Sequence, residues 1–170
     1  MTIHSSHPFA DPEEERDPVR RFRGRLGGTV SVWTTGSGPS RSGLTVSSLM
    51  VAHGDPGHVL GLVDPDSDLG VSLEPGGRCV VQLLEWPQRD LADAFAGVAP
   101  APGGVFTLGT WTDTEWGPLL EGVSAWAGVR VEETRGVGWS LLVDGVVEQV
   151  TIGEEAAPLV HRRGRYVRPT

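Results

Sequence analysis

This 170-residue sequence is first informative through what it lacks. All 14 of its basic residues are arginine, and the absence of lysine excludes catalysis through a lysine Schiff base. Its one cysteine, Cys79, excludes an internal disulfide and fits a reducing compartment. The N-terminus has no apolar signal segment, and no stretch approaches the about 18 apolar residues of a membrane span. The sequence therefore predicts a soluble, cytoplasmic protein.

Several catalytic signatures are missing as well. No Gly-x-Gly-x-x-Gly opens a helix and no phosphate loop ends in Lys-Ser or Lys-Thr, which excludes a Rossmann-type dehydrogenase. Gly-x-Ser-x-Gly is absent, and Cys79 lies in an apolar segment where a buried thiol is unreactive. The formal charge of −8 leaves no basic stripe for nucleic acid. What remains is a ligand site built from hydroxyls, backbone amides and helix ends.

The histidines do not predict a metal site. His53 and His58 have a spacing that would suit one face of a helix, but Asp55-Pro56-Gly57 between them predicts a turn. We therefore expect no metal ligands in this chain.

The presence of 24 glycines and 13 prolines favours many short elements in one domain, residues 17–170, after a flexible tail over 1–16. Alternating or β-branched segments predict strands at 29–35, 43–52, 57–63, 78–84, 105–111, 119–133, 139–151 and 160–167. The short, glycine-bearing connection 134–138 predicts that strands 119–133 and 139–151 pair as a hairpin. Helices are predicted from Pro18 to Gly27, over 66–73, and after Pro87, where Leu91, Ala94, Phe95 and Val98 repeat at helical spacing. Because the strands are mostly adjacent in sequence, the pattern favours a mainly β fold, an antiparallel barrel with two or three short helices.

The stretch 41–50 combines hydroxyls with apolar neighbours. In a strand, Thr45 and Ser47 would share one face and Val46 and Ser48 the other. Such a strand would offer short hydroxyl donors and backbone amides, on a rigid support, to a planar polar ligand. An ordinary half-buried strand is the alternative. Ser67, near the start of a short helix, is a candidate phosphate contact or a plain N-cap. Among the six tryptophans, Trp116 is the best candidate for an exposed aromatic at a pocket or subunit contact.

Seven weak motifs follow one another between residues 20 and 168. They are Phe22-Arg23 before strand 29–35, Gly43 to Ser48, Asp55-Pro56 with 59–63, Asp64 to Ser67, 79–84 with Gln88 and 91–97, 117–120 with Ala125-Trp126, and Gly164-Arg165-Tyr166. In this order they resemble the flavin reductase-like family, which has an FMN-binding split-barrel fold.

The resemblance implies a homodimer that binds FMN or FAD, often with flavin reduction by NADH or NADPH. It implies that Thr45, Val46, Ser47 and Ser48 border the isoalloxazine and ribityl groups and that Ser67 meets the phosphate. Gln82 stands where the family often has asparagine. We expect no catalytic side chain, because the flavin carries the hydride chemistry and the protein supplies orientation.

One departure keeps the function open. The family's Gly-Asp-His, on the nicotinamide side of the site, aligns with Gly138-Trp139-Ser140. The leading hypothesis is an NAD(P)H-dependent flavin reductase, including a reductase component for a monooxygenase. The alternatives are a flavin-binding module without turnover, an oxidoreductase of the same fold that uses a deazaflavin, and a barrel without a cofactor.

Overall fold

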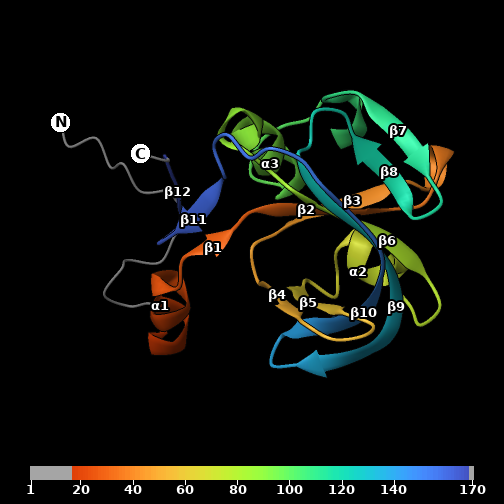
Figure 1. The fold of residues 1–170 in the computed structure, drawn as a ribbon. Helices are drawn as coiled ribbons and strands as arrows, with labels where there is room; N and C mark the ends of the chain where they lie inside the picture. Colours follow the sequence, from red (N-terminus) through yellow and green to blue (C-terminus); the bar gives the residue numbers. More distant parts are fainter. Residues whose placement is uncertain (1–16, 169–170) are drawn as a thin grey trace.

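The computed structural model describes residues 17–168, so the tail predicted over 1–16 lies outside the described residues. Three helices and twelve strands make up this part of the chain (Figure 1). They are α1 (Pro18–Arg25), β1 (Gly28–Thr29), β2 (Ser31–Thr35), β3 (Ser42–Val46), β4 (Leu49–Ala52), β5 (His58–Val63), α2 (Asp68–Ser72), β6 (Arg78–Leu83), α3 (Arg89–Phe95), β7 (Trp111–Thr114), β8 (Gly117–Leu120), β9 (Ala125–Val137), β10 (Ser140–Ile152), β11 (Val160–Arg162) and β12 (Arg165–Val167).

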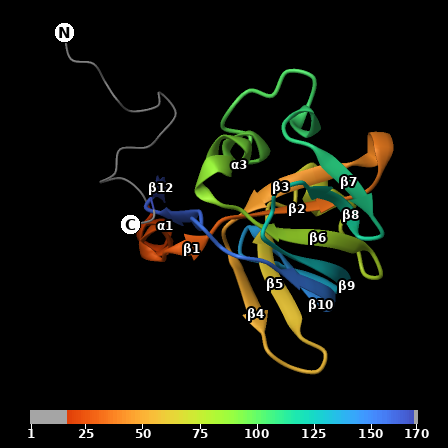
Figure 2. The same ribbon diagram turned by 45° about the horizontal axis from the view of Figure 1, so that its top comes forward.

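The central element is a seven-stranded antiparallel sheet in the order β3-β2-β6-β9-β10-β5-β4. Its two edge strands, β3 and β4, are consecutive in sequence, and only Ser47 and Ser48 separate them. The sheet curls until these two edges approach, so that Val46 of β3 belongs to the same core as Val59 and Val63 of β5. The break at Ser47-Ser48 is called here the seam; beside it the amide of Leu62 donates to the carbonyl of Ser48 at 2.9 Å and continues the β4–β5 pairing. The curled sheet, visible from two directions in Figures 1 and 2, confirms the predicted mainly β, barrel-like fold.

Two apolar clusters fill this fold. The first lies inside the curl around the fully buried Trp33, whose indole closely contacts the backbone of Gly61, where a Cβ would come within 2.5 Å of the ring. The second lies between the sheet and α3 and contains Val30, Leu84 and Phe95. Strand β6 separates the clusters and is buried along most of its length, which agrees with its nearly continuous apolar sequence.

The long hairpin of β9 and β10 confirms the expected pairing but moves the turn. Both strands have 13 residues and pair from Ser140↔Val137 to Ile152↔Ala125, so the turn is Gly138-Trp139 rather than the predicted five-residue connection. Gly138 has a φ of 56°, as a tight two-residue turn requires. Trp139 is 95% exposed at its tip.

Three sequence predictions about the strands are wrong in detail. The strand predicted over 105–111 is a 3₁₀ turn, Val105–Thr107, and β7 begins only at Trp111, because Gly103, Gly104 and Gly109 have positive φ values that no extended strand accommodates. The strand predicted over 43–52 is divided at Ser47-Ser48, and the one over 119–133 is divided near Gly122, whose φ is also positive.

Two predictions about apolar residues also need correction. Val98 lies beyond the end of α3 and is exposed, since the helix stops at Phe95 and Gly97 turns the chain; Ala92 is buried in its place. Trp116 is buried rather than exposed, packs against Trp126, and donates its indole N–H to Glu148 at 3.0 Å. Trp139 is the tryptophan that reaches solvent.

A small unit projects from one side of the barrel (Figures 1 and 2). Strands β1, β11 and β12 form a three-stranded antiparallel sheet, and α1 lies beside it. The side chain of Asp17 caps α1 by accepting from the amide of Val19 at 2.9 Å, and Pro18 opens the helix, as the sequence predicts. None of the helices within residues 17–168 is long and apolar enough to cross a membrane.

Candidate functional site

Two adjoining cavities lie where α3, the end of β3 and the hairpin β11–β12 meet. The larger, of about 460 Å³, is lined by Trp86, Arg89, Asp93, Ala96, Val98, His161, Gly164, Arg165 and Tyr166. The smaller, of about 210 Å³, is lined by Val30, Thr45, Ser47, Ala96, His161 and Tyr166. Because Ala96, His161 and Tyr166 line both, the cavities form one continuous recess, and its larger part has a volume typical of small-molecule sites.

The strand end that the sequence singled out forms one wall of this recess. Thr45 donates its hydroxyl to the carbonyl of Ala92 at 2.6 Å, which ties β3 to the last turn of α3. Ser47 lines the smaller cavity and its side chain is exposed. The hydroxyl of Ser31 fixes the backbone between them by donating to the carbonyl of Val46 at 2.6 Å. Short polar groups therefore stand here on a rigid support.

The backbone of β1 passes close to the break between β3 and β4. A Cβ on Gly28 would lie 2.8 Å from the carbonyl oxygen of Ser47, so a glycine is needed where β1 passes the seam. Ser47 and Ser48 continue neither strand, and both side chains are exposed. Val46 differs, because its side chain belongs to the core inside the curl and only its backbone faces the seam.

Ser67 is the N-cap of α2. Its hydroxyl accepts from the amide of Gly70 at 3.0 Å and donates to the carbonyl of Asp64 at 2.6 Å. The plain capping role that the sequence allowed is thus present, and Ser67 lines neither cavity. It lies four residues after the end of β5, the strand whose Leu62 donates to the carbonyl of Ser48.

Gln82 lies on β6 and is fully buried. Its amide nitrogen donates to the hydroxyl of Thr34 at 3.0 Å and to the carbonyl of Pro118 at 3.4 Å, and its oxygen accepts from the amide of Leu120 at 2.9 Å. These bonds hold β8 against the sheet. The side chain reaches neither cavity, so Gln82 can act on a ligand only through the position of its neighbours.

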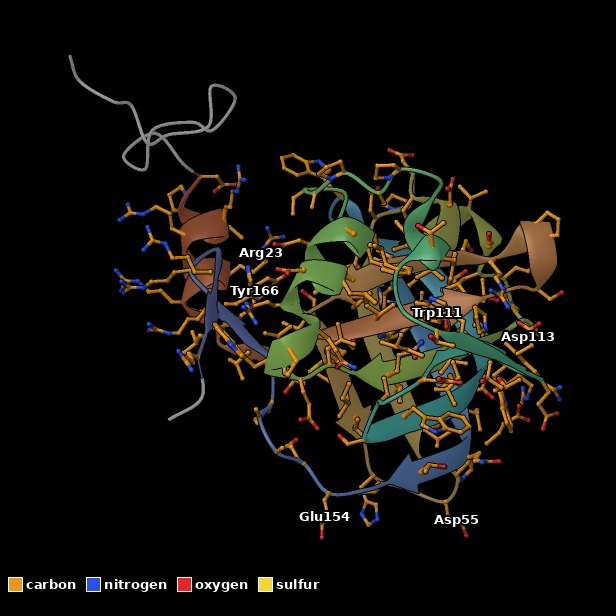
Figure 3. The ribbon with its side chains drawn as sticks, turned by 90° about the horizontal axis from the view of Figure 1, so that it is seen from above. Arg23, Asp55, Trp111, Asp113, Glu154 and Tyr166 are labelled. Atoms are coloured by element: carbon orange, nitrogen blue, oxygen red, sulfur yellow. The ribbon has the colours of Figure 1, made fainter. Side chains whose placement is uncertain are left out.

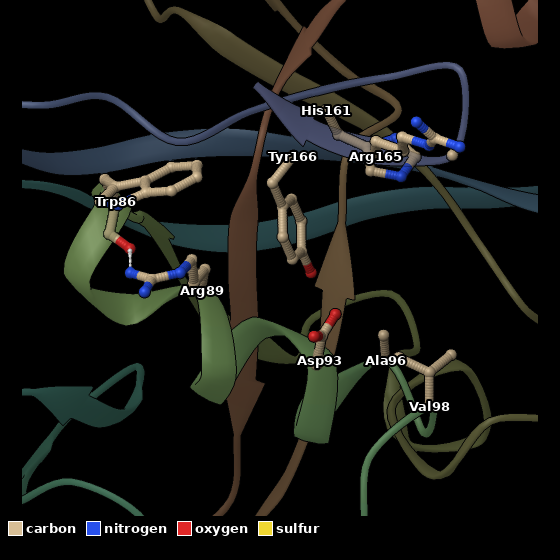
Figure 4. A pocket seen from close by; sticks show the side chains of 9 residues that line it. Trp86, Arg89, Asp93, Ala96, Val98, His161, Arg165 and Tyr166 are labelled. Carbon is tan, nitrogen blue, oxygen red and sulfur yellow. Dashed lines mark hydrogen bonds between the residues drawn. The ribbon is translucent and has the colours of Figure 1, made fainter. Parts of the chain in front are cut away.

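The larger cavity carries aromatic and cationic groups on α3 and the turn before it. The guanidinium of Arg89 lies over the ring of Trp86, 4.6 Å from its centroid, and Arg89 also donates to the carbonyl of Trp86 at 3.0 Å (Figure 4). The guanidinium of Arg168 lies 5.9 Å from the same centroid. A flat aromatic face beside guanidinium groups suits a heteroaromatic ligand that carries phosphate.

The opposite wall is formed by the C-terminal hairpin. Tyr166 points its hydroxyl toward the carboxylate of Asp93 on α3, and burial together with this neighbouring carboxylate holds the pKa of the phenol well above its usual range (Figure 4). His161 packs edge-on against Tyr166, with ring centroids 5.7 Å apart. Burial lowers the pKa of His161, an effect that the charge of Asp93 partly opposes. At neutral pH this wall therefore presents a neutral phenol and a predominantly neutral imidazole.

Sequence reasoning missed His161, Trp86 and Arg89 as lining residues. Gly164-Arg165-Tyr166 was noted as a motif but without a role. The distance along the chain between Thr45 and Tyr166 explains the omission, because only the pairing of β1 with β11 brings the C-terminus to the seam. The Gly164-Arg165-Tyr166 motif itself was the available signal.

Nucleophilic or titratable side chains also lie at two places away from the recess. Cys79 is buried and desolvation raises the pKa of its thiol to about 12, which agrees with the expected unreactive cysteine. His58, Glu132 and Asp144 lie on β5, β9 and β10 with their ligating atoms within 4.8 Å of one another. Nδ1 of His58 is 2.6 Å from Asp144 Oδ1, and this hydrogen bond raises the pKa of the imidazole. The group is an ion-paired cluster on the outer surface of the sheet.

Comparison with known proteins places the chain in a family. The family model described as "Flavin reductase like domain" matches residues 23–170. The chain belongs to the flavin reductase-like family. An NADH:FMN oxidoreductase from Rhodococcus erythropolis is 32% identical over 145 residues, which cover 83% of this chain and 75% of that protein. A 4-hydroxyphenylacetate 3-monooxygenase reductase component from Pseudomonas aeruginosa is 23% identical, over 88% of this chain and 89% of that protein.

The fold agrees with this membership of the flavin reductase-like family. The structure of the NADH:FAD oxidoreductase SgcE6 from Streptomyces globisporus superposes with a TM-score of 0.81 at 26% identity, over 97% of this chain and 98% of that one. The resemblance inferred from seven short motifs is therefore confirmed, and so is the barrel fold that it implied.

Proposed function

We propose that this protein is a flavin reductase that uses NADH or NADPH to reduce FMN or FAD. The observation that carries the proposal is the recess in which Thr45 and Ser47, at the end of β3, face His161 and Tyr166 of the C-terminal hairpin. Membership of the flavin reductase-like family and similarity to an NADH:FMN oxidoreductase support it.

The residues present fit a flavin. Its ring system is planar, with polar atoms along one edge, and the strand end supplies hydroxyls, exposed backbone and a close-packed glycine at that position. We propose that Thr45, Ser47 and Ser48, with the backbone of Val46, border the ring and the ribityl chain. Gln82 would act indirectly, by holding β8 on the sheet. The bound flavin supplies the hydride acceptor, while the protein's own residues orient the reactants and exclude water.

The larger cavity is the proposed place for the nicotinamide nucleotide. Trp86 offers an aromatic face, and Arg89 and Arg165 offer positive charge for phosphate. At neutral pH His161 and Tyr166 are uncharged, so they do not repel the positively charged nicotinamide product. Neither side chain has to exchange a proton for hydride transfer to occur.

Ser67 is the proposed phosphate contact, and the substitution Ser67→Asp tests it. Aspartate caps a helix as well as serine does, so α2 should persist, but its charge would repel a flavin phosphate. We expect affinity for FMN to fall at least tenfold while affinity for riboflavin changes little, as measured by quenching of flavin fluorescence. Equal losses for both ligands would remove Ser67 from the phosphate site.

The decisive experiment is anaerobic mixing of the flavin-loaded protein with NADH or NADPH. Bleaching of the visible flavin band on a catalytic time scale is the expected result. Ser47→Leu should weaken flavin binding by filling the smaller cavity, whereas Ser40→Leu, in the exposed turn after β2, serves as a matched control. A protein that leaves the fluorescence of added FMN unchanged would overturn the proposal.

A flavin carrier without turnover is the second candidate. It is favoured by one observation: the tip of the β9–β10 hairpin carries Trp139 and Ser140 where the family pattern has a histidine. Tight flavin binding without bleaching by either nicotinamide nucleotide would support this reading. Reduction only of an added deazaflavin would instead favour the remaining alternative, an oxidoreductase with a different carrier.

We further propose a homodimer that works in the cytoplasm and supplies reduced flavin to a partner monooxygenase. The similarity to a monooxygenase reductase component supports the partner. The unreactive, unpaired Cys79 is compatible with a reducing compartment. The expected test for the partner is stimulation of a purified flavin-dependent oxygenase by this protein with NADH and FMN, against a control without the reductase.

A further inference from the structure

The projecting unit of the fold, residues 17–29 with 160–168, is called here the basic arm. It comprises α1, β1, β11 and β12, and it is internally connected. Gly28 pairs with His161, and the amide of Arg163 donates to the carbonyl of Gly24 in α1 at 2.7 Å. Helix α1 is therefore fixed to the hairpin through its backbone, and its side chains are left to point elsewhere.

The apolar side of α1 has no cover within the described subunit. The helix contains no buried residue, and Val19, Phe22 and Leu26, which fall on one face, are 72%, 70% and 62% exposed. A helix of eight residues is marginal in water unless its apolar face packs on something. The residues 17–168 therefore leave the stripe Val19-Phe22-Leu26 available for contact with another surface.

Charge indicates what that surface is. The basic arm contains eight arginines and one acidic residue, Asp17, a formal charge of +7. Residues 30–159 contain 17 acidic residues and five arginines, a formal charge of −12. Figure 3 shows Arg23 on the arm, far to one side of the acidic Asp55 and Glu154 on the barrel. An anionic lipid surface would attract the arm but repel the barrel, whereas the barrel of a second copy attracts it.

The barrel offers an apolar surface with acidic neighbours. Edge strand β4 exposes Met50, and Leu62 of the adjacent β5 is exposed on the same face; Val51 is exposed at the opposite face of β4. An exposed apolar edge strand invites another chain. The acidic residues Asp55, Glu132 and Asp144 lie on or beside the strands that continue this surface.

We propose that the basic arm of one subunit docks on the β4–β5 surface of a second copy, and that the second copy returns the contact. A reciprocal, two-fold exchange pairs the same two patches twice, which is the usual form of a closed dimer. Because the arm also carries His161 and Tyr166, its docking would fix one wall of the recess. The inference rests on the homodimer proposed above and goes beyond it in naming the two surfaces.

The first test is the dimer dissociation constant by sedimentation equilibrium. Phe22→Asp should raise it at least tenfold, because it places a charge in the apolar stripe. Val71→Asp, at a comparably exposed valine on α2, should leave it unchanged. Sodium chloride should weaken the wild-type dimer, since the arm and barrel attract by charge. An unchanged dissociation constant in Phe22→Asp, or a wild-type protein that stays monomeric, would overturn the inference.

The second test uses exchanged charges. One variant carries Arg20→Glu with Arg23→Glu in the arm, and another carries Asp55→Arg with Glu132→Arg on the barrel. In a subunit with both sets reversed, the arm is negative and the docking surface positive, so two such subunits attract each other as two wild-type subunits do. In a mixed dimer, each contact would join two surfaces of the same charge. Only the two homodimers should therefore form. Each set alone should give monomers. Free mixing between wild-type and doubly reversed subunits would contradict docking of arm on barrel.

Anionic and neutral lipid vesicles supply the competing outcome. The wild-type protein could bind anionic vesicles, lose this binding in Phe22→Asp, and form no dimer in solution. That result would contradict the proposal that the arm docks on a second copy. Flavin binding is measured on the same samples. A monomer that still reduces FMN would refute the docking inference alone, while a dimer that binds no flavin would refute the proposed function alone.

Discussion

The barrel and the basic arm are stabilised in opposite ways. In the barrel, Trp33 is fully buried and closely contacts Gly61 inside a curled sheet that surrounds it. In the arm, Phe22 lies on a capped helix and touches no core of its own subunit. Both are aromatic residues in regular elements, so local sequence preference does not separate them. The barrel buries its own apolar residues, whereas the apolar face of α1 is left exposed by the described residues.

The largest predicted effect comes from removing the centre of the barrel core. Trp33→Ala should lower the free energy of unfolding by about 3–5 kcal/mol, because it leaves a cavity within the curl and removes the indole bond to Ser31. Phe22→Ala should change it by less than about 0.5 kcal/mol under conditions where the protein is monomeric. Urea unfolding followed by circular dichroism measures both, and similar losses would erase the contrast between the two regions.

The second effect tests the polar interior of the barrel. Gln82→Leu should cost about 1–3 kcal/mol, because the amide of Leu120 and the carbonyl of Pro118 lose a partner while they stay buried. The expected readout is a lower urea midpoint with faster hydrogen exchange at Leu120. Gln149→Leu, at an exposed position on β10, is the matched control. Unchanged exchange at Leu120 would show that Gln82 does not hold β8.

A smaller effect is expected at the joint between the arm and the barrel. Tyr166→Phe removes the hydroxyl that faces Asp93 and should cost about 1 kcal/mol of stability, mostly as local opening of the C-terminal hairpin. Hydrogen exchange of the β11–β12 amides should increase while the barrel amides keep their protection. Equal acceleration across the barrel would mean that the arm and barrel unfold as one unit.

The smallest effect is a pH dependence on the barrel surface. The hydrogen bond to Asp144 raises the folded-state pKa of His58 above its usual 6.5, so its stabilising contribution is present below pH 6.5 and is lost as pH rises through the folded pKa. Thermal midpoints of the wild type should therefore fall slightly over that range relative to those of Asp144→Asn. Parallel profiles for the two proteins would indicate that the pair contributes nothing measurable.

Much of the barrel could be predicted from local pattern. The Asp17-Pro18 helix start, the alternating strand over 29–35 and the buried run at 78–84 each carry their signal in a few adjacent residues, and the structure confirms them. The strand predicted over 105–111 is wrong because its apolar residues pack against α3 without forming an extended strand. Phe106, in the 3₁₀ turn, and Trp111, at the start of β7, pack around Phe95, and Gly109 with its positive φ prevents one extended strand between them.

The candidate site was only half predictable. Thr45 and Ser47 are candidates because hydroxyls among apolar residues are conspicuous in the sequence, and the structure places both on the wall of the smaller cavity. Gln82 is equally polar, but it forms hydrogen bonds in the core with Thr34 and Leu120, which are distant from it in sequence. Likewise, Trp116 was expected to be exposed but is buried, whereas Trp139 is exposed, since the exposure of a tryptophan depends on what packs over it.

The sequence by itself determined the composition of the strands, the helix starts, the family and the acidic overall charge, because each depends on residue types and their order along the chain. Only the tertiary structure decided that the C-terminal hairpin closes the recess beside β3, and that positive charge gathers on the arm while negative charge gathers on the barrel. Long-range strand pairing produces both results. The pairing of β1 with β11 joins residues more than a hundred positions apart, and no local pattern encodes that contact.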